Sequence, residues 1–382
     1  MQDLPKQGSK TSGTILPDSS ACSAAGERPV ADPLCYGSDV IRRIVPILIL
    51  ACCLLPTSAQ TSSGLYIGEL PVENQFEQAV PVAAVLNQVL VRLTGRVGQN
   101  LVSELQLSND LIEQMILTRQ FSRVSVPDPE GRFIDVRMQR IEFDQQAVNQ
   151  LLDRAGLARW GQERPQMLIW VTTDQAGSAE YLEQDSITEH ALERAAFRYG
   201  LNLIRPILDA GDRIEVSPSD IRGGFTDAAE NAKQRYGASG TIMLDLRQNP
   251  DFVTGRWSWK LDEMERAFER SGGDPAEVID LGLGRIAAAL SNRYAVLAGR
   301  PGQQRLVISG LSNEVQYAEI TRYLNTLTGV ESLRVNRAGP DFIEFELIAS
   351  GSGLESRIAL SDLLLFERSD PVTRALHYRL AW

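Results

Sequence analysis

The chain has 382 residues, a net charge of −11 and 43% hydrophobic residues, and it contains only four Cys and two His. This length is enough for two or three domains, and the apolar share is typical of a water-soluble globular protein. The acidic excess argues against a protein that coats duplex nucleic acid, because neutralising phosphates requires a basic face. Most metal and thiol chemistry also lacks its ligands here.

An apolar run near the N-terminus predicts export. The run covers residues 44–55 and is too short to cross a bilayer, since a membrane-spanning helix needs about 20 residues. Arg42 and Arg43 precede it and small residues up to Ala59 follow it, which is the pattern of a secretory signal. We therefore predict a signal peptide over residues 40–59, cleaved after Ala59, and a periplasmic location.

The rest of the N-terminus bears on the translation start and on the cysteines. Residues 1–39 lack an apolar period and are predicted to be a non-native or disordered extension, with translation starting at Val40. An alternative to simple cleavage is a lipoprotein whose lipid is attached to Cys52. Cleavage after Ala59 leaves a mature chain without thiols, because the cysteines are Cys22, Cys35, Cys52 and Cys53.

Residues 65–160 are predicted to form a first α+β domain. Its first helix carries an apolar stripe and ends at Gly95. The stripe consists of Val82, Leu86, Val89 and Leu93. The other elements predicted here are helices over residues 109–117 and 145–155, and strands over residues 121–126 and 133–143 that are joined by a turn.

Residues 166–298 are predicted to form a second α/β domain with a mixed sheet. Its first strand, residues 167–173, is continuously apolar, which is typical of a strand buried on both faces. The segment Ser186-Ile187-Thr188-Glu189 is a capping box and predicts the start of a helix. The further elements are a strand over 201–208, a helix over 225–236, a hairpin of strands over 241–247 and 252–261, and a long helix that begins at Asp274-Pro275.

Trp257 and Trp259 in that hairpin are the candidate binding residues, because both lie on one face of its second strand. Two aromatic rings on one face can stack on a sugar or line a groove for a protein partner. Packing in the core is the alternative use of two such side chains. The alternation by itself leaves both uses open.

Residues 304–382 are predicted to form a third domain, after a joint at residues 299–302. Apolar stripes and alternation predict the order βαββαβ, which is a ferredoxin-like arrangement. The fold class predicted for the whole chain is therefore α+β, built from three small mixed α/β units.

Several segments resemble a family of proteobacterial exported proteins that carry domain of unknown function 2066. The resemblance covers most of residues 65–298 and implies an exported location and an architecture, with no catalytic residues. Its motifs are Val89-Leu90-Val91-Arg92-Leu93-Thr94-Gly95, Ala155-Gly156-Leu157-Ala158-Arg159-Trp160-Gly161, Arg164-Pro165 and Leu168-Ile169-Trp170-Val171. Residues 232–238 also resemble the step from helix to strand in periplasmic modules of outer-membrane lipoprotein activators and of the Tol translocation protein, which bind other proteins.

No catalytic constellation emerges from the sequence. His190 and His377 are predicted to face solvent in different domains, so together they make no zinc site. Gly282-Leu283-Gly284 lies within a helical stripe and favours close helix packing over a nucleotide loop. Gly223-Gly224 suits a turn, or alternatively an anion at the start of the next helix.

We therefore predict a non-enzymatic, protein-binding adaptor of the cell envelope. The sequence indicates no cofactor and no metal. The predicted partner is another envelope protein and not nucleic acid, with membrane contact only through the cleaved signal or a lipidated Cys52. Two alternatives stay open: a polysaccharide hydrolase with two carboxylates about 5 to 9 Å apart, or a small-ligand carrier with its pocket between the first two domains.

Overall fold

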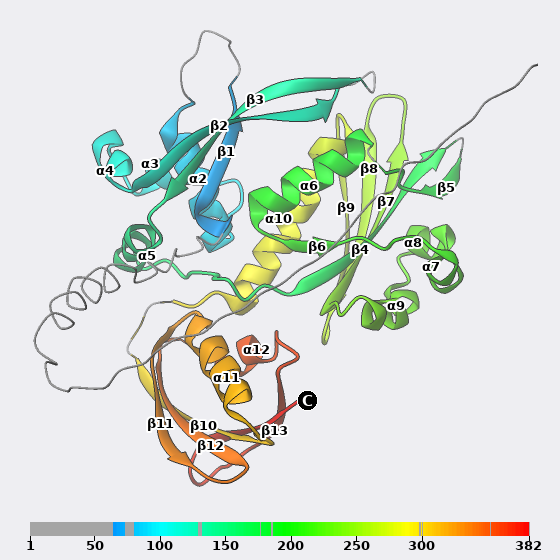
Figure 1. The fold of residues 1–382 in the computed structure, drawn as a ribbon. Helices are drawn as coiled ribbons and strands as arrows, with labels where there is room; N and C mark the ends of the chain where they lie inside the picture. The colour runs from blue at the N-terminus through cyan, green and yellow to red at the C-terminus, as the bar shows by residue number, and fades with distance from the viewer. Residues whose placement is uncertain are drawn as a thin grey trace, which may run out of the picture. The chain divides into compact units, whose positions relative to one another are not determined.

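The computed structural model describes most of the chain from Gly64 to Ala381 (Figure 1). The described ranges are 64–72, 80–128, 132–175, 177–184, 186–297, 299, 301–351 and 353–381. The predicted extension (residues 1–39) and signal peptide (residues 40–59) lie outside the described residues and stay predictions. Within the described ranges the fold is α+β, as predicted, and contains three sheets.

The first sheet is antiparallel and has the strand order β1-β3-β2. Its strands are β1 (Ile67–Pro71), β2 (Ile116–Pro127) and β3 (Phe133–Phe143). The helical segments around it are η1 (Gly64–Tyr66), α2 (Val82–Thr94), α3 (Leu101–Glu104), α4 (Asn109–Gln114) and α5 (Gln145–Arg154). The helix end predicted at Gly95 is confirmed, because this residue has a φ of 67° and donates its N–H to the carbonyl of Val91.

The core of this part forms between one face of α2 and the sheet. Leu86, Val89 and Leu93 of the predicted α2 stripe are buried in one hydrophobic cluster with Ile141 and Phe143 of β3, and Val82 is partly buried against it. One departure lies just before β2, where the predicted helix over 109–117 ends at Gln114. Its last residues instead begin a strand that is longer than the one predicted.

The second sheet is mixed and has the order β5-β4-β7-β8-β9, with β6 also paired to β4. Its strands are β4 (Gln166–Gln175), β5 (Ser178–Tyr181), β6 (Asn202–Ile204), β7 (Gly240–Gln248), β8 (Val253–Leu261) and β9 (Met264–Gly272). The helical segments are α6 (Ile187–Tyr199), α7 (Ala210–Glu215), α8 (Pro218–Gly223), η2 (Thr226–Ala229), α9 (Glu230–Arg235) and α10 (Pro275–Tyr294). β4 pairs parallel with β6 and β7, while the other pairs are antiparallel.

Strand β4 is buried on both faces, as its apolar run predicts. Ile169 belongs to the core cluster that also contains residues of α6 and α10. Leu168 and Trp170 belong to a second cluster, with residues of α8 and α9. Sequence reasoning missed β5, β9, α7 and α8, and the strand predicted over 201–208 is only the short β6.

The third sheet has the order β11-β12-β10-β14-β13. Its elements are β10 (Gly302–Ser309), α11 (Glu314–Thr326), β11 (Val330–Ala338), β12 (Phe342–Ala349), α12 (Leu354–Ile358), β13 (Leu364–Ser369) and β14 (Ala375–Leu380). The chain order is thus βαββαββ, one strand more than the predicted βαββαβ. The additional strand is β13, and the closing strand β14 pairs parallel with β10.

Candidate partner-binding surface

The longest uncovered strand edge belongs to the hairpin of β2 and β3, which we call the ribbon. β1 pairs with β3 only from Met138 to Glu142, so the rest of the ribbon is two-stranded. Figure 1 shows it extending past β1. β2 forms the end of its sheet, and its outer edge pairs with no other strand among the described residues. Such an edge presents free N–H and C=O groups to any strand that can align with it.

Large hydrophobic side chains are exposed along the ribbon. Nine of the twelve residues of β2 are exposed and none is buried, which is unusual for a strand with several apolar residues. The large hydrophobic side chains lie on both faces of the ribbon, with Phe121 and Phe133 on one face and Val124 and Ile134 on the other, and exposed apolar side chains beside a free strand edge suit an interaction site. The side chains and their exposed fractions are Leu117 56%, Phe121 46%, Val124 42%, Phe133 58% and Ile134 47%.

The strand register divides the ribbon into two faces. Residues directly opposite each other share a face, so Phe121 lies on the same face as Gln139, and Arg123 on the same face as Arg137. We call the face with Phe121, Arg123 and Arg137 the arginine face. Closer to β1 the same face is buried against α2, because Gln139 is only 2% exposed.

The arginine face carries two arginines that form no ion pair among the described residues, although Asp135 lies on the same face. The Arg137 guanidinium lies 4.2 Å from the centre of the Phe121 ring, a cation–π contact. Among the described residues, no carboxylate lies within ion-pair distance of Arg123 or Arg137, whereas Arg119 pairs with Glu113. Arg123 and Arg137 stand directly opposite each other, and like charges in that position are destabilising.

His190 lies where the end of the ribbon meets α6. Its ring makes an edge-to-face contact with Phe133, with ring centres 6.2 Å apart. Its side chain is 24% exposed, and Glu193 is 3.8 Å away. The prediction that His190 faces open solvent is therefore incomplete, because the ribbon lies against this part of α6 and sequence periodicity within one helix does not show that.

Trp257 and Trp259 lie in the core of the second sheet. Their side chains are 0% and 2% exposed, and both belong to the cluster that contains α6 and α10. Trp257 is stacked on Phe268 of β9 with ring centres 6.0 Å apart. β8 is an interior strand, between β7 and β9, so its apolar face is covered. Neither indole is accessible to a partner or a sugar, and we place neither in the binding surface.

Asp174 and Asp245, near the carboxyl ends of β4 and β7, are two carboxylates that contact the same arginine. Asp245 is 0% exposed and accepts hydrogen bonds from Thr172 (2.9 Å) and Arg247 (2.7 Å). Arg222 lies between the two carboxylates, 2.8 Å from Asp174 and 3.4 Å from Asp245. Arginines therefore compensate both charges, which is the arrangement of a structural ion-pair cluster and favours no acid–base role.

The motifs that carry the family resemblance converge on a joint between the first and second sheets. Arg92 is 1% exposed, and its guanidinium donates to the carbonyls of Gly64 (3.0 Å), Ile67 (2.6 Å) and Arg198 (3.2 Å). Arg164 donates to five carbonyls, those of Arg92, Trp160, Gly161, Tyr199 and Gly200. Arg92 thus binds the carbonyl end of α6, and Arg164 binds the carbonyl ends of both α2 and α6, where the helix dipole favours positive charge.

Electrostatics at this joint indicate a structural role. Burial lowers the pKa of Arg92 to about 10. Burial and the neighbouring Arg92 lower the pKa of Arg164 to about 9, so both remain charged at neutral pH. The Arg164 guanidinium also stacks on Trp160, 3.9 Å from its ring centre. Main-chain carbonyls satisfy most of these donors, so the motif residues hold the two sheets together.

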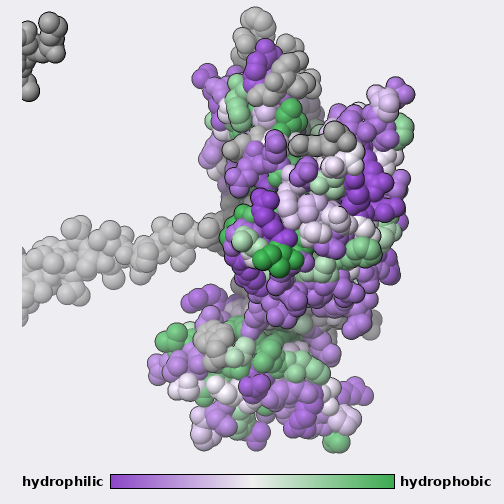
Figure 2. Space-filling model, turned by 90° about the vertical axis from the view of Figure 1, so that its right-hand side faces the viewer, coloured by the Kyte–Doolittle hydropathy of each residue, from purple (hydrophilic) through white to green (hydrophobic). Residues whose placement is uncertain are grey.

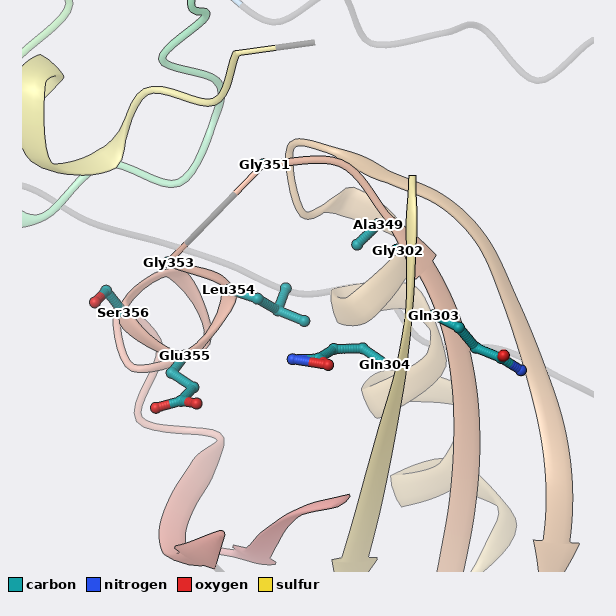
Figure 3. Close-up of a pocket in the computed structure, with 9 residues that line it drawn as sticks. All are labelled: Gly302, Gln303, Gln304, Ala349, Gly351, Gly353, Leu354, Glu355 and Ser356. Atoms are coloured by element: carbon teal, nitrogen blue, oxygen red, sulfur yellow. The ribbon is translucent and has the colours of Figure 1, made fainter. Parts of the chain in front are cut away.

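A hollow of about 430 Å³ lies beside the third sheet, between the start of β10, the end of β12 and α12. Figure 3 shows Gln304 and Leu354 pointing toward each other across it, while Gln303 points away. Its lining is mostly polar side chains and backbone. This hollow is neither apolar nor between the first two units, where the carrier alternative places its pocket.

The glycine motifs have structural explanations. Gly282 of α10 packs against the Trp257 indole so closely that a Cβ there would overlap the ring, which fits the prediction of close helix packing. Gly224 is the C-cap of α8 and donates to the carbonyls of Asp220 and Ile221, so Gly223-Gly224 ends a helix. Among the described residues there is no cluster of three or more His, Cys, Asp or Glu that could hold a metal ion.

Exposed apolar side chains also occur on the end strands of the third sheet, including Val335 of β11 and Phe366 of β13. The face seen in Figure 2 is mainly hydrophilic, with its hydrophobic residues in small separate groups. No helix in the described part of the chain has both the length and the apolar character needed to span a membrane.

Sequence reasoning missed Phe121, Arg123 and Arg137 as candidate binding residues. The available signal was that residues 116–127 combine strand-forming residues with no consistent apolar face.

Comparison with known proteins adds a domain of unknown function. A family model described as domain of unknown function (DUF8605) matches residues 59–161, which include the whole first sheet. It is a different domain from the one named by the resemblance above. No curated protein matches the chain.

Solved structures show only distant similarity. The chain is similar to a ribosomal subunit interface protein from Coxiella burnetii, with 16% identity, 33% of this chain and 96% of that chain covered, and a TM-score of 0.19. It is also similar to the LpoB C-terminal domain from Salmonella enterica, with 16% identity, 33% and 93% covered, and a TM-score of 0.22. At these TM-scores neither similarity bears on function.

Proposed function

We propose that the protein is a non-enzymatic adaptor of the cell envelope that binds another protein through the β2–β3 ribbon. The observation that carries this proposal is the uncovered edge of β2, flanked by exposed Phe121 and Val124. A partner strand that aligns with this edge gains main-chain hydrogen bonds, and alternate side chains of the ribbon supply contacts on both faces. Envelope location rests on the predicted signal peptide and on the resemblance to an exported family.

The free edge of β9 differs in character. β9 also forms the end of its sheet, but its exposed positions include charges of both signs, among them Glu265, Arg266 and Glu269. Charged edges of mixed sign protect a sheet from pairing with other chains. β2 instead combines apolar and arginine side chains, so it is the edge better suited to a partner.

The proposal is tested by cross-linking from defined positions in cells. A photo-reactive amino acid replaces Ser122 of β2 in one full-length version and Ala267 of β9 in a matched control, because both positions are exposed on edge strands. We expect a specific adduct from position 122 and none from position 267. The captured protein is identified by mass spectrometry and purified for direct binding.

The binding measurement decides the result. Truncation of a central aromatic contact in an interface typically weakens binding by about 2 kcal/mol or more, so Phe121→Ala is expected to raise the Kd roughly thirtyfold. Equal adducts at both positions, or unchanged affinity of the identified protein for the Phe121→Ala chain, contradicts binding through the ribbon.

A further inference from the structure

We infer that the ribbon recognises an acidic, extended peptide segment that adds to the outer edge of β2. This inference rests on the proposed function and specifies the chemistry of the partner. Arg119, Phe121 and Arg123 alternate along one side of the edge strand, and Arg137 stands opposite Arg123 on the same face. A strand laid beside β2 would place its own alternate side chains next to these three positions.

Charge is the first argument for an acidic partner. The chain carries a net charge of −11, yet the ribbon presents Arg123 on its edge strand and Arg137 on the neighbouring strand, both without an ion-pair partner among the described residues. The acidic groups nearest in register are Asp135, which lies opposite Ser125 on the arginine face, and Glu113, which pairs with Arg119. Carboxylates on an added strand would relieve the repulsion between the two opposed arginines.

Charge also argues against a second copy of the chain. Pairing of two β2 edges in one continuous sheet would gather Arg119, Arg123 and Arg137 of both copies on the same face. The chain's own first sixty residues carry five basic and five acidic residues, so they offer no acidic strand in excess. An acidic segment from another protein fits the surface better than either.

Hydrogen bonding argues against a lipid surface as the occupant. The outer edge of β2 leaves main-chain groups unpaired, and groups of that kind cannot be satisfied within hydrocarbon. A strand that adds to the edge satisfies them while it brings carboxylates to the arginines. The edge and the charge are therefore explained together by one ligand, an acidic β-strand.

The test uses the full chain and four fluorescent ten-residue peptides with blocked ends. The first alternates Glu and Val, and the second has Gln in place of every Glu. The third and fourth keep Glu but carry N-methyl groups on the odd or the even amides. Because only alternate amides of an added strand point toward β2, we expect one methylated peptide to lose binding and the other to keep it.

The arginines are tested by a double variant, Arg123→Gln with Arg137→Gln. Each exposed ion pair is worth about a two- to fivefold change in affinity, so the variant should bind the Glu peptide about four- to twenty-five-fold more weakly and the Gln peptide unchanged. The matched control, Arg266→Gln with Arg270→Gln on β9, should bind both peptides like the wild type. Thermal melts show that each variant is folded, and hydrogen exchange of β2 amides should slow when the Glu peptide is bound.

Each outcome bears on a different statement. Equal affinity for the Glu and Gln peptides overturns the acidic preference and leaves strand addition standing. Equal binding of both methylated peptides overturns strand addition. If no peptide binds while the partner identified by cross-linking still binds the ribbon, the inference fails and the proposed function survives. Arginine-dependent binding to anionic vesicles, or an arginine-dependent dimer in sedimentation, without peptide binding also overturns the inference.

Discussion

Replacing Gly282 with alanine tests how α10 packs on the second sheet. A Cβ at this position would lie 2.5 Å from Nε1 of Trp257 and closer still to two carbons of its ring, whereas carbon contacts are favourable at about 3.5 to 4.0 Å. The indole cannot move outward, since Trp257 is 0% exposed and stacked on Phe268. The added methyl group must therefore displace the helix, the ring or both.

The expected magnitude is a difference between two terms. Alanine in place of glycine within a helix contributes about 1 kcal/mol of stability. Overpacking a dense core costs about 1 to 3 kcal/mol, and the overlap here exceeds the size of a small adjustment. We expect Gly282→Ala to lower the free energy of unfolding by about 1 to 2 kcal/mol, the upper part of that range less the helix gain.

Urea unfolding of the full chain measures this change, and a double-mutant cycle assigns it. Trp257→Phe makes room for the methyl group, and it removes an indole N–H that has no hydrogen-bond partner among the described residues. We expect the pair to be coupled by about 1 kcal/mol or more in the favourable direction. Leu281→Ala, on the exposed side of the same helix, controls for changes in helix propensity. A Gly282→Ala chain as stable as the wild type, or a cycle without coupling, refutes the packing explanation.

Three further perturbations follow from contacts described by the structure. Arg164→Lys retains the positive charge but loses the planar guanidinium that donates to five carbonyls. It should therefore lower the free energy of unfolding by about 2 to 4 kcal/mol, measured in urea. A smaller change than that of the exposed Arg266→Lys would contradict a structural role for Arg164. Hydrogen bonds from Arg235 hold the pKa of Asp209 below its ordinary value. The ionised carboxylate therefore contributes stability above about pH 4, and this stability is lost on acidification. The urea midpoint of Asp209→Asn should fall less between about pH 5 and pH 3 than that of the wild type. Glu163 accepts from both N–H (2.6 Å) and Oγ1 (2.8 Å) of Thr328, so Glu163→Ala should speed exchange of the Thr328 amide hydrogen, and an unchanged rate would show that this contact does not hold the start of β11.

The helices and strands that could be predicted are those whose buried residues recur at a regular spacing along the sequence. The α2 stripe, its end at Gly95 and the strand over residues 133–143 agree with the structure, because each has a clear period and a clear stop signal. β9 was missed because it is an edge strand whose exposed positions carry charges, which hides the strand period. β13 was missed because apolar residues (Leu365, Phe366) and charged residues (Glu367, Arg368) are both exposed in it, which hides the strand period, and with it the βαββαββ order from β10 to β14 was missed.

The candidate site was less predictable than the fold. Trp257 and Trp259 share a strand face, as alternation indicates, but their burial depends on α10 and on the neighbouring strands. The opposition of Arg123 and Arg137 depends on the register of the hairpin, which brings together residues fourteen positions apart. Local sequence patterns contain neither kind of information, since both arise only when distant segments pair.

The joint formed by Arg92 and Arg164 bears on how such chains can diverge. The hydrogen-bond acceptors of both arginines are main-chain carbonyl oxygens, which every residue type provides. Neighbouring positions are accordingly free to vary in side chain, whereas the two guanidinium groups have no chemical substitute. Proteins grouped by this short signature would then share this joint between two sheets, with no implication that they share a ligand or a binding partner.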